Sequence, residues 1–289
     1  MKLSIVTPSF NQGAFIERTL SSVQSQDYKA HEHVVFDGGS SDNTVAILSQ
    51  YTGRIHWRSQ PDKGQAHAIN KGIQATDGDI IGWLNSDDIY YPGAFRTVTA
   101  YFETHPDVDV VYGMADHIDV HDKPFENYPT EPWDFERLKQ TCFICQPALF
   151  FRRDLVAKHG LLDESLQYCM DYEYWLRLGA CGARFGYLGQ KLAGSRLYGE
   201  TKTLRNRKEA HAEINDMLLR RLARVPDHWL YGYAHVVVDQ RIDRDSHPRQ
   251  FTAAVALRSI LAAIYWNNRV SQNMRRMTLN WIVHAALHR

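Results

Sequence analysis

The stretch Asp79-Ile80-Ile81-Gly82-Trp83-Leu84-Asn85-Ser86-Asp87-Asp88 decides the fold. The apolar run from Ile80 to Leu84 has the length of a strand and lacks polar alternation, which is typical of a strand buried on both faces in a parallel sheet. The run ends in a polar turn that carries two adjacent carboxylates, Asp87 and Asp88. Because open α/β sheets bind ligands at the carboxyl ends of their strands, this turn is predicted to lie at a ligand site.

Two interpretations of Asp87 and Asp88 follow from their chemistry. Adjacent carboxylates repel each other and favour a cation between them. Neither His nor Cys lies nearby, so an oxygen-only ligand set would suit Mg²⁺ or Mn²⁺. Alternatively, because turns are rich in acids, the pair caps a helix that begins near Pro92. Sequence physics alone leaves both interpretations open.

The first hundred residues alternate between strand and helix signals. Strands are predicted at residues 3–7, 33–36, 55–58 and 80–84, and helices at about 14–25, 43–51, 64–73 and from 92 onward. Alternation with short links predicts right-handed crossovers and a parallel, doubly wound α/β sheet. On such a sheet Thr7-Pro8, Asp37 and the Asp87-Asp88 pair converge at one edge.

Asp37 opens a second polar turn, Asp37-Gly38-Gly39-Ser40-Ser41-Asp42. Its carboxylate could accept a hydrogen bond from a ring N–H of a nucleotide base, while the glycines allow close approach; turn chemistry is the alternative. The chain has no Gly-x-Gly-x-x-Gly after the first strand and no Gly-Lys-Ser/Thr loop, so neither a dinucleotide fold nor a P-loop is indicated. A metal at Asp87 and Asp88 would then be the counter-charge for a diphosphate.

Composition bounds the class of protein. The 289 residues are 44% hydrophobic, which permits a substantial core, and Lys+Arg and Asp+Glu balance at 33 each, so no nucleic-acid partner is expected. No run of 18 apolar residues predicts a spanning helix. Four cysteines without a framework of close pairs fit a reducing cytoplasm.

Six stretches of the chain carry recognisable motifs, namely Ser4-Ile5-Val6-Thr7-Pro8-Ser9-Phe10-Asn11, Asp37 to Asp42, Pro61-Asp62-Lys63-Gly64 with Asn70-Lys71-Gly72, Leu84 to Asp88, Gln146 to Arg153, and Met170 to Leu178. In this order and spacing they resemble the family 2 (GT-A fold) inverting glycosyltransferases. The resemblance implies a GT-A catalytic domain at residues 1–203, with a mostly parallel central sheet flanked by helices. Within it, residues 1–105 would bind the nucleotide-sugar and residues 106–203 the acceptor.

The resemblance also implies roles for individual residues. Asp171 would be the general base, Asp37 would contact the nucleoside base, and Asp87 and Asp88 would hold Mn²⁺ or Mg²⁺. Residue chemistry alone leaves Asp171 equally well explained as the N-cap of a helix, and Glu173 points elsewhere on that helix. Further donor contacts are expected at Thr7, Pro8, Lys63, Gly64, Asn70, Asn85, Arg196 and Lys202.

Arg196 and Lys202 belong to a stretch that resembles a mobile loop of the family, where they would meet phosphate oxygens or remain solvated charges. The sequence departs from the family pattern at three positions. Gly38 follows Asp37 where a second acid is common, Met170 replaces an acid, and Tyr198 stands where a His is frequent. These departures support a non-catalytic nucleotide- or glycan-binding relative as the alternative. A sugar nucleotidyltransferase fits less well, because a Gly-rich phosphate loop followed by Arg is missing.

Residues 204–289 are predicted to form an α-helical C-terminal extension. No acid follows Asp245, although six arginines do, beside apolar residues such as Leu261 and Trp266. This pattern suits an anionic membrane surface, and the alternatives are packing on the catalytic domain or a homo-oligomer contact.

The family resemblance completes the functional expectation. The donor would be a nucleoside-diphosphate sugar, with a UDP-sugar favoured. The acceptor would be a glycan or lipid-linked hydroxyl in bacterial surface polysaccharide or lipopolysaccharide assembly. The protein would be cytoplasmic, with peripheral contact to the inner membrane as a further expectation.

Overall fold

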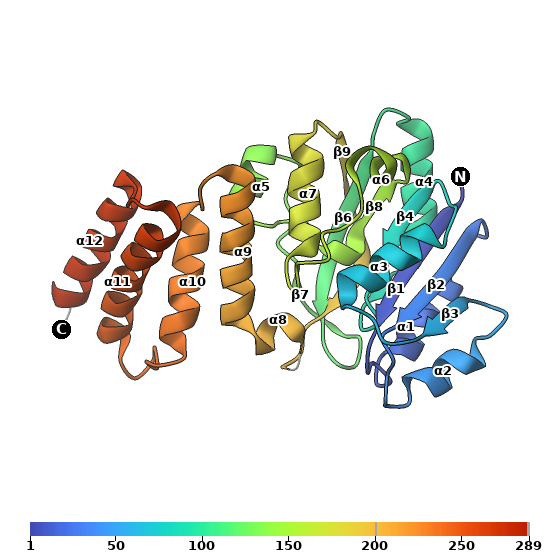
Figure 1. Cartoon of the computed structure of the whole chain (residues 1–289), viewed down its shortest axis with the longest axis horizontal. Helices are drawn as coiled ribbons and strands as arrows, with labels where there is room; N and C mark the ends of the chain where they lie inside the picture. The colour runs from blue at the N-terminus through green and yellow to red at the C-terminus, as the bar shows by residue number, and fades with distance from the viewer. Residues whose placement is uncertain (200, 288–289) are drawn as a thin grey trace. The chain divides into compact units, whose positions relative to one another are not determined.

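The computed structural model describes residues 1–199 and 201–287 (Figure 1). The chain divides into two compact units. One comprises Met1–Phe135 with Phe143–Thr201, and the other comprises Glu136–Cys142 with Lys202–Arg289. The first unit contains a mixed α/β sheet, and the second is helical.

Nine strands form one sheet in the first unit (Figure 1), in the order β3-β2-β1-β4-β8-β6-β9-β5, with β7 paired to β6. The strands are β1 (Leu3–Ser9), β2 (His31–Asp37), β3 (His56–Ser59), β4 (Ile80–Trp83), β5 (Ile89–Tyr90), β6 (Val110–Ile118), β7 (Pro124–Asn127), β8 (Leu149–Arg152) and β9 (Phe185–Arg196).

The predicted α/β fold class is confirmed in the amino-terminal half. Strands β3, β2, β1 and β4 run parallel, with Ser9 opposite Asp37 and Asp37 opposite Ser59. Their carboxyl ends therefore share one edge, as parallel pairing requires. Beyond β4, the antiparallel strand β8 links this half to β6, which pairs parallel with β9 and antiparallel with β7.

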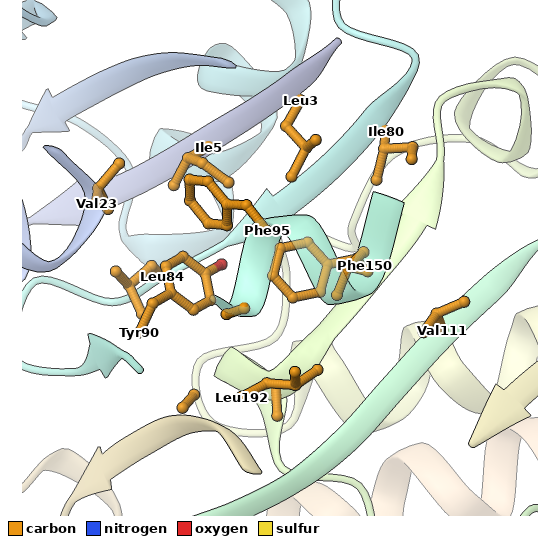
Figure 2. Packing of buried hydrophobic residues seen from close by; sticks show 14 of the residues in the cluster. Leu3, Ile5, Val23, Ile80, Leu84, Tyr90, Phe95, Val111, Phe150 and Leu192 are labelled. Atoms are coloured by element: carbon orange, nitrogen blue, oxygen red, sulfur yellow. The ribbon is translucent and has the colours of Figure 1, made fainter. Parts of the chain in front are cut away.

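Consecutive residues of β8 show how helices cover both faces of the sheet. Phe150 packs against Phe95 of α4 (Ala94–Thr104) with ring centroids 6.3 Å apart, whereas Phe151 packs against Tyr174 of α7 (Met170–Ala180) at 5.5 Å. Figure 2 shows Phe150 and Phe95 together with Leu3, Ile5 and Ile80 in the core on the α4 side. The helical segments of the first unit are α1 (Ile16–Gln24), α2 (Thr44–Gln50), α3 (Gln65–Gln74), α4 (Ala94–Thr104), the 3₁₀ turn η1 (Gln146–Ala148), α6 (Asp154–His159) and α7 (Met170–Ala180).

Gly82 in the middle of β4 has no room for a side chain. A Cβ at this position would lie 2.7 Å from the Phe150 ring and 2.9 Å from Ile5. The glycine thus lets aromatic packing reach the strand whose end carries the two acids, and the predicted burial of β4 on both faces is confirmed because all four of its residues are buried.

The second unit consists of helices that pack on their own core. In it, α10 contacts α11 through His235 and Phe251, and α12 through Tyr231 and Trp281, with ring centroids 4.9 and 5.0 Å apart. No helix within the described residues is long and apolar enough to cross a membrane. The helical segments are α5 (Phe135–Gln140), which begins at the unit boundary, α8 (Lys202–Arg205), α9 (Arg207–Leu222), α10 (Asp227–Asp239), α11 (Pro248–Asn267) and α12 (Gln272–Leu287).

His33 gives the first unit a testable dependence on pH. The imidazole is buried in β2, its Nε2 lies 2.9 Å from Thr7 Oγ1, and burial lowers its pKa from 6.5 to about 3. Between these two values the unfolded chain binds the proton and the folded chain does not, so His33 lowers stability as the pH falls below 6.5. We expect its contribution to cost about 2 kcal/mol of unfolding free energy between about pH 7 and 5.

Urea unfolding at both pH values, with the variants His33→Gln and His56→Gln, measures this contribution. His56 is exposed on β3, so its variant should keep the wild-type pH slope. The slope of His33→Gln should be reduced but not abolished, because burial also lowers the pKa of half-buried His211, to about 4. Equal slopes for wild type and His33→Gln would contradict the assignment.

Candidate active site

The turn after β4 carries the acidic pair Asp87 and Asp88, directly before β5. Asp88 is only 4% exposed and Asp87 is half-buried. The capping alternative is wrong, because α4 begins at Ala94, its N-cap is Gly93, and that cap makes no side-chain hydrogen bond. The two carboxylates therefore occupy the carboxyl edge of the sheet for another reason.

Hydrogen bonds from three elements hold Asp88 in place. One carboxylate oxygen accepts the backbone N–H of Arg196 at 2.7 Å, and the other accepts Asn85 Nδ2 at 3.2 Å. The Thr19 hydroxyl of α1 donates to the Asp88 carbonyl at 2.8 Å. Asn85 is itself fixed, because its Oδ1 accepts hydrogen bonds from Trp83 Nε1 and Gln65 Nε2, both at 2.8 Å.

The electrostatics of the pair favour a cation. Burial raises the pKa of Asp88 well above its usual range, and the charge of Asp87 raises it further. Burial also raises the pKa of Asp87, although Arg196 and a hydrogen bond from the Tyr198 hydroxyl oppose the shift. Two buried carboxylates whose ionised forms are disfavoured would be stabilised by a divalent ion.

The acidic turn suits an Mg²⁺ or Mn²⁺ ion that is bound partly by protein carboxylates and partly by oxygens of a ligand. It does not provide a complete set of protein ligands. No group of three or more His, Cys, Asp or Glu in the described part of the chain could hold a metal. Magnesium in nucleotide sites is commonly bound by one or two carboxylates together with substrate phosphates and waters. Asp87 has the greater exposure of the pair and is the better candidate for a direct ligand.

The sequence predicted that Arg196 lies in a loop facing the donor. In the structure Arg196 instead ends strand β9, and its side chain is fully buried. Its Nε donates to the Asp87 carbonyl at 2.7 Å, and its two terminal nitrogens donate to the Asp119 carbonyl and the Asp122 carboxylate. The guanidinium also stacks 4.7 Å from the centroid of Phe15. Arg196 therefore links the acidic turn by hydrogen bonds to the segment that contains Asp119 and Asp122, and its charge is not presented to a phosphate.

Asp37 uses its carboxylate within its own turn. One oxygen accepts the N–H groups of Gly39 and Ser40 and the Ser59 hydroxyl, and the other accepts the Ser40 hydroxyl. The residue is only 2% exposed. Asp37 thus shapes the loop at the end of β2, and a direct contact between its carboxylate and a nucleoside base stays a prediction.

Phe10 is a residue for which the sequence analysis predicted no role. Its side chain is 60% exposed at the end of β1, and a Cβ on Gly38 would lie 3.3 Å from its ring. The loop is ordered by Asn11, whose Oδ1 accepts the Ser41 N–H at 2.9 Å. A large aromatic residue inside an otherwise polar turn is the sequence signal that could have singled it out as a candidate ligand contact.

The loop before α7 is tied to α3 by Asn70. The Asn70 amide donates to the Leu162 carbonyl and accepts the Leu162 N–H, both at 3.0 Å, and also donates to Glu164. Asn70 is only 3% exposed, so the prediction that it contacts the donor is not supported. Further along the same loop, Gln167 lies 3.4 Å from the position of a Cβ on Gly64. The entry to α7 is therefore next to the donor-side loop.

Asp171 lies in the first turn of α7, half-buried, and its carboxylate accepts the Tyr172 N–H at 2.7 Å. The N-cap of this helix is Cys169, so Asp171 is not the cap itself. Glu173 is 1% exposed and forms an ion pair with Arg177 at 3.0 Å, which removes it as a rival base.

The remaining predicted donor residues divide by exposure. Lys63 is exposed beside Gly64, whose N–H bonds Asp62 at 2.7 Å and whose φ of 113° favours glycine. Thr7 and Pro8 are buried within β1, and the Thr7 hydroxyl is engaged with His33, so contact of these side chains with the donor is not supported. Lys202 belongs to the helical unit, where burial lowers its pKa and Glu213 opposes the shift.

Comparison with known proteins finds similarity to glycosyltransferases. A family model described as "Glycosyl transferase family 2" matches residues 4–160. An uncharacterized glycosyltransferase of Rickettsia prowazekii is 24% identical over 300 residues, which cover 96% of this chain and 92% of that protein. The chondroitin synthase of Escherichia coli is 27% identical over 227 residues, which cover 76% of this chain and 33% of that protein.

Two solved structures share the fold at low identity. TarS 1-349 of S. aureus, in complex with UDP-GlcNAc, has a TM-score of 0.65 and 15% identity, and the match covers 99% of this chain and 90% of that one. The mannosyltransferase PcManGT of Pyrobaculum calidifontis, in complex with GDP-Man and Mn²⁺, has a TM-score of 0.57 and 16% identity, with 99% and 86% covered.

The sheet, its acidic edge and these neighbours define a glycosyltransferase with the GT-A fold. Since the family model covers more than half of the sequence, the chain belongs to glycosyl transferase family 2. The predicted family and fold are thereby confirmed.

Replacing Arg196 with Lys tests whether its hydrogen bonds hold the acidic turn in place. Lysine keeps the charge, but its three N–H groups lie on one nitrogen and cannot reach acceptors that are spread around the planar guanidinium, so buried acceptors are left unsatisfied. We expect a loss of about 1–3 kcal/mol in unfolding free energy, together with weaker metal-dependent binding of a nucleoside diphosphate, measured by urea unfolding and calorimetry.

Arg184→Lys is the matched control, because the pair formed by Arg184 and Asp107 is 59% exposed on both sides. An exposed ion pair contributes little, and its variant should change stability by less than about 0.5 kcal/mol. If the two variants behave alike in both measurements, the hydrogen bonds of Arg196 do not hold the acidic turn in place.

Proposed function

We propose that the chain is an inverting, metal-dependent glycosyltransferase that moves a sugar from a nucleoside-diphosphate sugar to a hydroxyl group. The observation that carries the proposal is the acidic pair of half-buried Asp87 and buried Asp88 at the sheet edge formed by β1, β2 and β4. Such a pair is suited to a cation and, through it, to a diphosphate. Residues 1–203 are proposed as the catalytic domain and 204–289 as its extension.

Each residue in the proposed reaction has one task. Asp171 accepts the proton of the acceptor hydroxyl, whose oxygen then forms the new bond to the anomeric carbon. The bond from that carbon to the diphosphate breaks on the opposite face, which inverts the configuration. Asp87 and Asp88 would hold Mn²⁺ or Mg²⁺, which supplies charge stabilisation for the leaving diphosphate. Asn85 keeps Asp88 oriented.

The donor is proposed to be a UDP-sugar. Support comes from the solved neighbours, which are complexes with UDP-GlcNAc, UDP and GDP-Man. In this chain the exposed ring of Phe10 would stack on the nucleoside base, with Gly38 of the Asp37 turn beside it. Lys63, exposed next to Gly64, is proposed to lie near the donor phosphates, and Lys202 stays a weaker candidate.

The acceptor is proposed to be a glycan or a lipid-linked glycan in bacterial surface polysaccharide assembly. The named relative of E. coli is a chondroitin synthase, which supports a polysaccharide acceptor. We further propose that the protein acts on the cytoplasmic side of the inner membrane, in peripheral contact with it through residues 204–289.

Asp171→Asn tests the proposed base. The amide keeps the shape of the side chain but cannot take a proton, so we expect transfer to fall by about 10²–10⁴-fold while donor binding is retained. Radiolabelled sugar transfer gives the rate, and thermal shift with nucleoside diphosphate gives binding.

The control for this experiment is Asp154→Asn. Asp154 is likewise an acid in the first turn of a helix, α6, and it is exposed. Its variant should keep full activity. Wild-type transfer rates in Asp171→Asn would remove Asp171 from the mechanism, and donor binding without any transfer by the wild type would favour a non-catalytic binding relative.

Asp87→Asn tests the metal. The wild type should be stabilised by one of UDP, GDP, dTDP or CMP, and the stabilisation should require Mn²⁺ or Mg²⁺. At a hundredfold excess of ligand over Kd the effect is about 2.7 kcal/mol, which is large enough to see in thermal unfolding.

The variant should lose the metal-dependent part of this shift, because one of two carboxylates has been neutralised. Asp154→Asn should keep it. A shift that is equally large in the presence of EDTA would show that the nucleotide binds without metal and would overturn the cofactor assignment.

A further inference from the structure

Helices α11 and α12 expose an apolar face that no described element covers. Seven of the eleven large hydrophobic side chains exposed in the described residues lie between positions 257 and 283. The spacing places them on one side of each helix, at i, i+4, i+7 and i+8 on α11 and at i, i+3 and i+4 on α12. This apolar face consists of Leu257, Leu261, Ile264, Tyr265, Leu279, Ile282 and Val283.

The opposite side of the same helices explains why the face is left over. Val255, Ala262, Trp266 and Met274 are buried, and Phe251 and Val255 pack with Ala234 of α10 in a local core. Within the helical unit α10, α11 and α12 lie side by side (Figure 1). The core requirement of this unit is therefore already met by the inner side, and the exposed apolar residues add nothing to it.

Arginines border the apolar face. Arg275 precedes Leu279 by four residues and Ile282 by seven, and Arg276 precedes Val283 by seven, so the two arginines lie on the same side of α12 as these residues. Both are exposed. On α11, Arg258 lies three residues before Leu261. No Asp or Glu occurs after Asp245, so nothing on either helix neutralises this positive charge.

We propose that the apolar face docks on an anionic lipid surface. Lipid phosphates complement Arg275 and Arg276, and the boundary between headgroups and acyl chains accommodates the leucine, isoleucine and valine side chains. Tyr265, 76% exposed, is amphipathic and suits the same boundary. The helices lie in the plane of the interface, since no described helix is long and apolar enough to span it.

Charge argues against a second copy of the chain as the occupant. A symmetric contact through this face would bring arginines of both copies together without an acid on either helix to pair with them. This docking surface rests on the proposed membrane association and specifies which residues make the contact. It does not depend on the proposed sugar-transfer chemistry.

Vesicle flotation of the full chain tests the proposal, with vesicles of phosphatidylcholine alone and vesicles that also contain phosphatidylglycerol. The wild type should float with the anionic vesicles, and less so at high salt. The double variant Leu261→Gln, Ile264→Gln should bind at least about tenfold more weakly. The double variant Arg275→Gln, Arg276→Gln should lose the preference for phosphatidylglycerol.

Two control variants match these changes elsewhere on the chain. Phe125→Gln removes an exposed apolar residue of β7, and Arg220→Gln with Arg221→Gln removes two adjacent exposed arginines of α9. Both controls should bind vesicles as the wild type does. Circular dichroism should show unchanged helix content, because every replaced side chain is exposed.

Three outcomes would overturn the proposal. The wild type does not bind anionic vesicles, the face variants bind as well as the controls, or light scattering shows a dimer that Leu261→Gln with Ile264→Gln dissociates. Nucleoside-diphosphate binding is measured on the same preparations. If the protein binds a nucleoside diphosphate but not vesicles, only the docking surface is refuted. If it binds vesicles but not a nucleoside diphosphate, only the proposed function is refuted.

Discussion

Two carboxylates at consecutive positions in the turn after β4, buried Asp88 and half-buried Asp87, are the constraint on which the rest of the first unit depends. Neither charge is favoured there, as the raised pKa values of Asp87 and Asp88 show. The chain offsets part of the cost with donors from separate elements, namely the backbone and guanidinium of Arg196, Tyr198 and Asn85. The remaining cost is what a bound cation would relieve, so order at this turn and the proposed metal binding would have the same origin.

A second set of hydrogen bonds holds the segment between α6 and α7. Buried Asn70 joins α3 to Leu162 of this loop, and half-buried Arg177 donates from α7 to the carbonyls of His159, at the end of α6, and Leu161. The start of the loop is thus held by side chains from two helices. Asp171 follows it by a few residues, which means that the proposed base is fixed by contacts up to 94 residues apart in sequence.

Local patterns predicted the first half of the fold and failed where partners are distant. Strands β1 to β4 and the helices between them follow from apolar periodicity, which a short window contains. Strand β9 does not, because Gly189, Gln190 and Lys191 interrupt its apolar character and its partners are β6 and β5. For Arg196 and Asn70 the family resemblance implied a donor contact, which stays a prediction. The hydrogen-bond partners that the structure gives them lie 74 to 109 residues away, where spacing gives no signal.

The state of the polar groups before any ligand binds limits how the donor can be recognised. The carboxylate of Asp37 already accepts four hydrogen bonds, and Asp88 accepts bonds on both oxygens. These acids are satisfied by their own turns together with Ser59 of β3 and Arg196 of β9, so the turns are formed in advance and little ordering is required on binding. Recognition must then come from groups that still face solvent. At this edge those are the ring of Phe10, the ammonium of Lys63 and the more exposed carboxylate, Asp87. A flat aromatic face accepts any base, so discrimination between nucleosides at this site would depend on hydrogen bonds from the backbone of the two loops rather than on the buried acids.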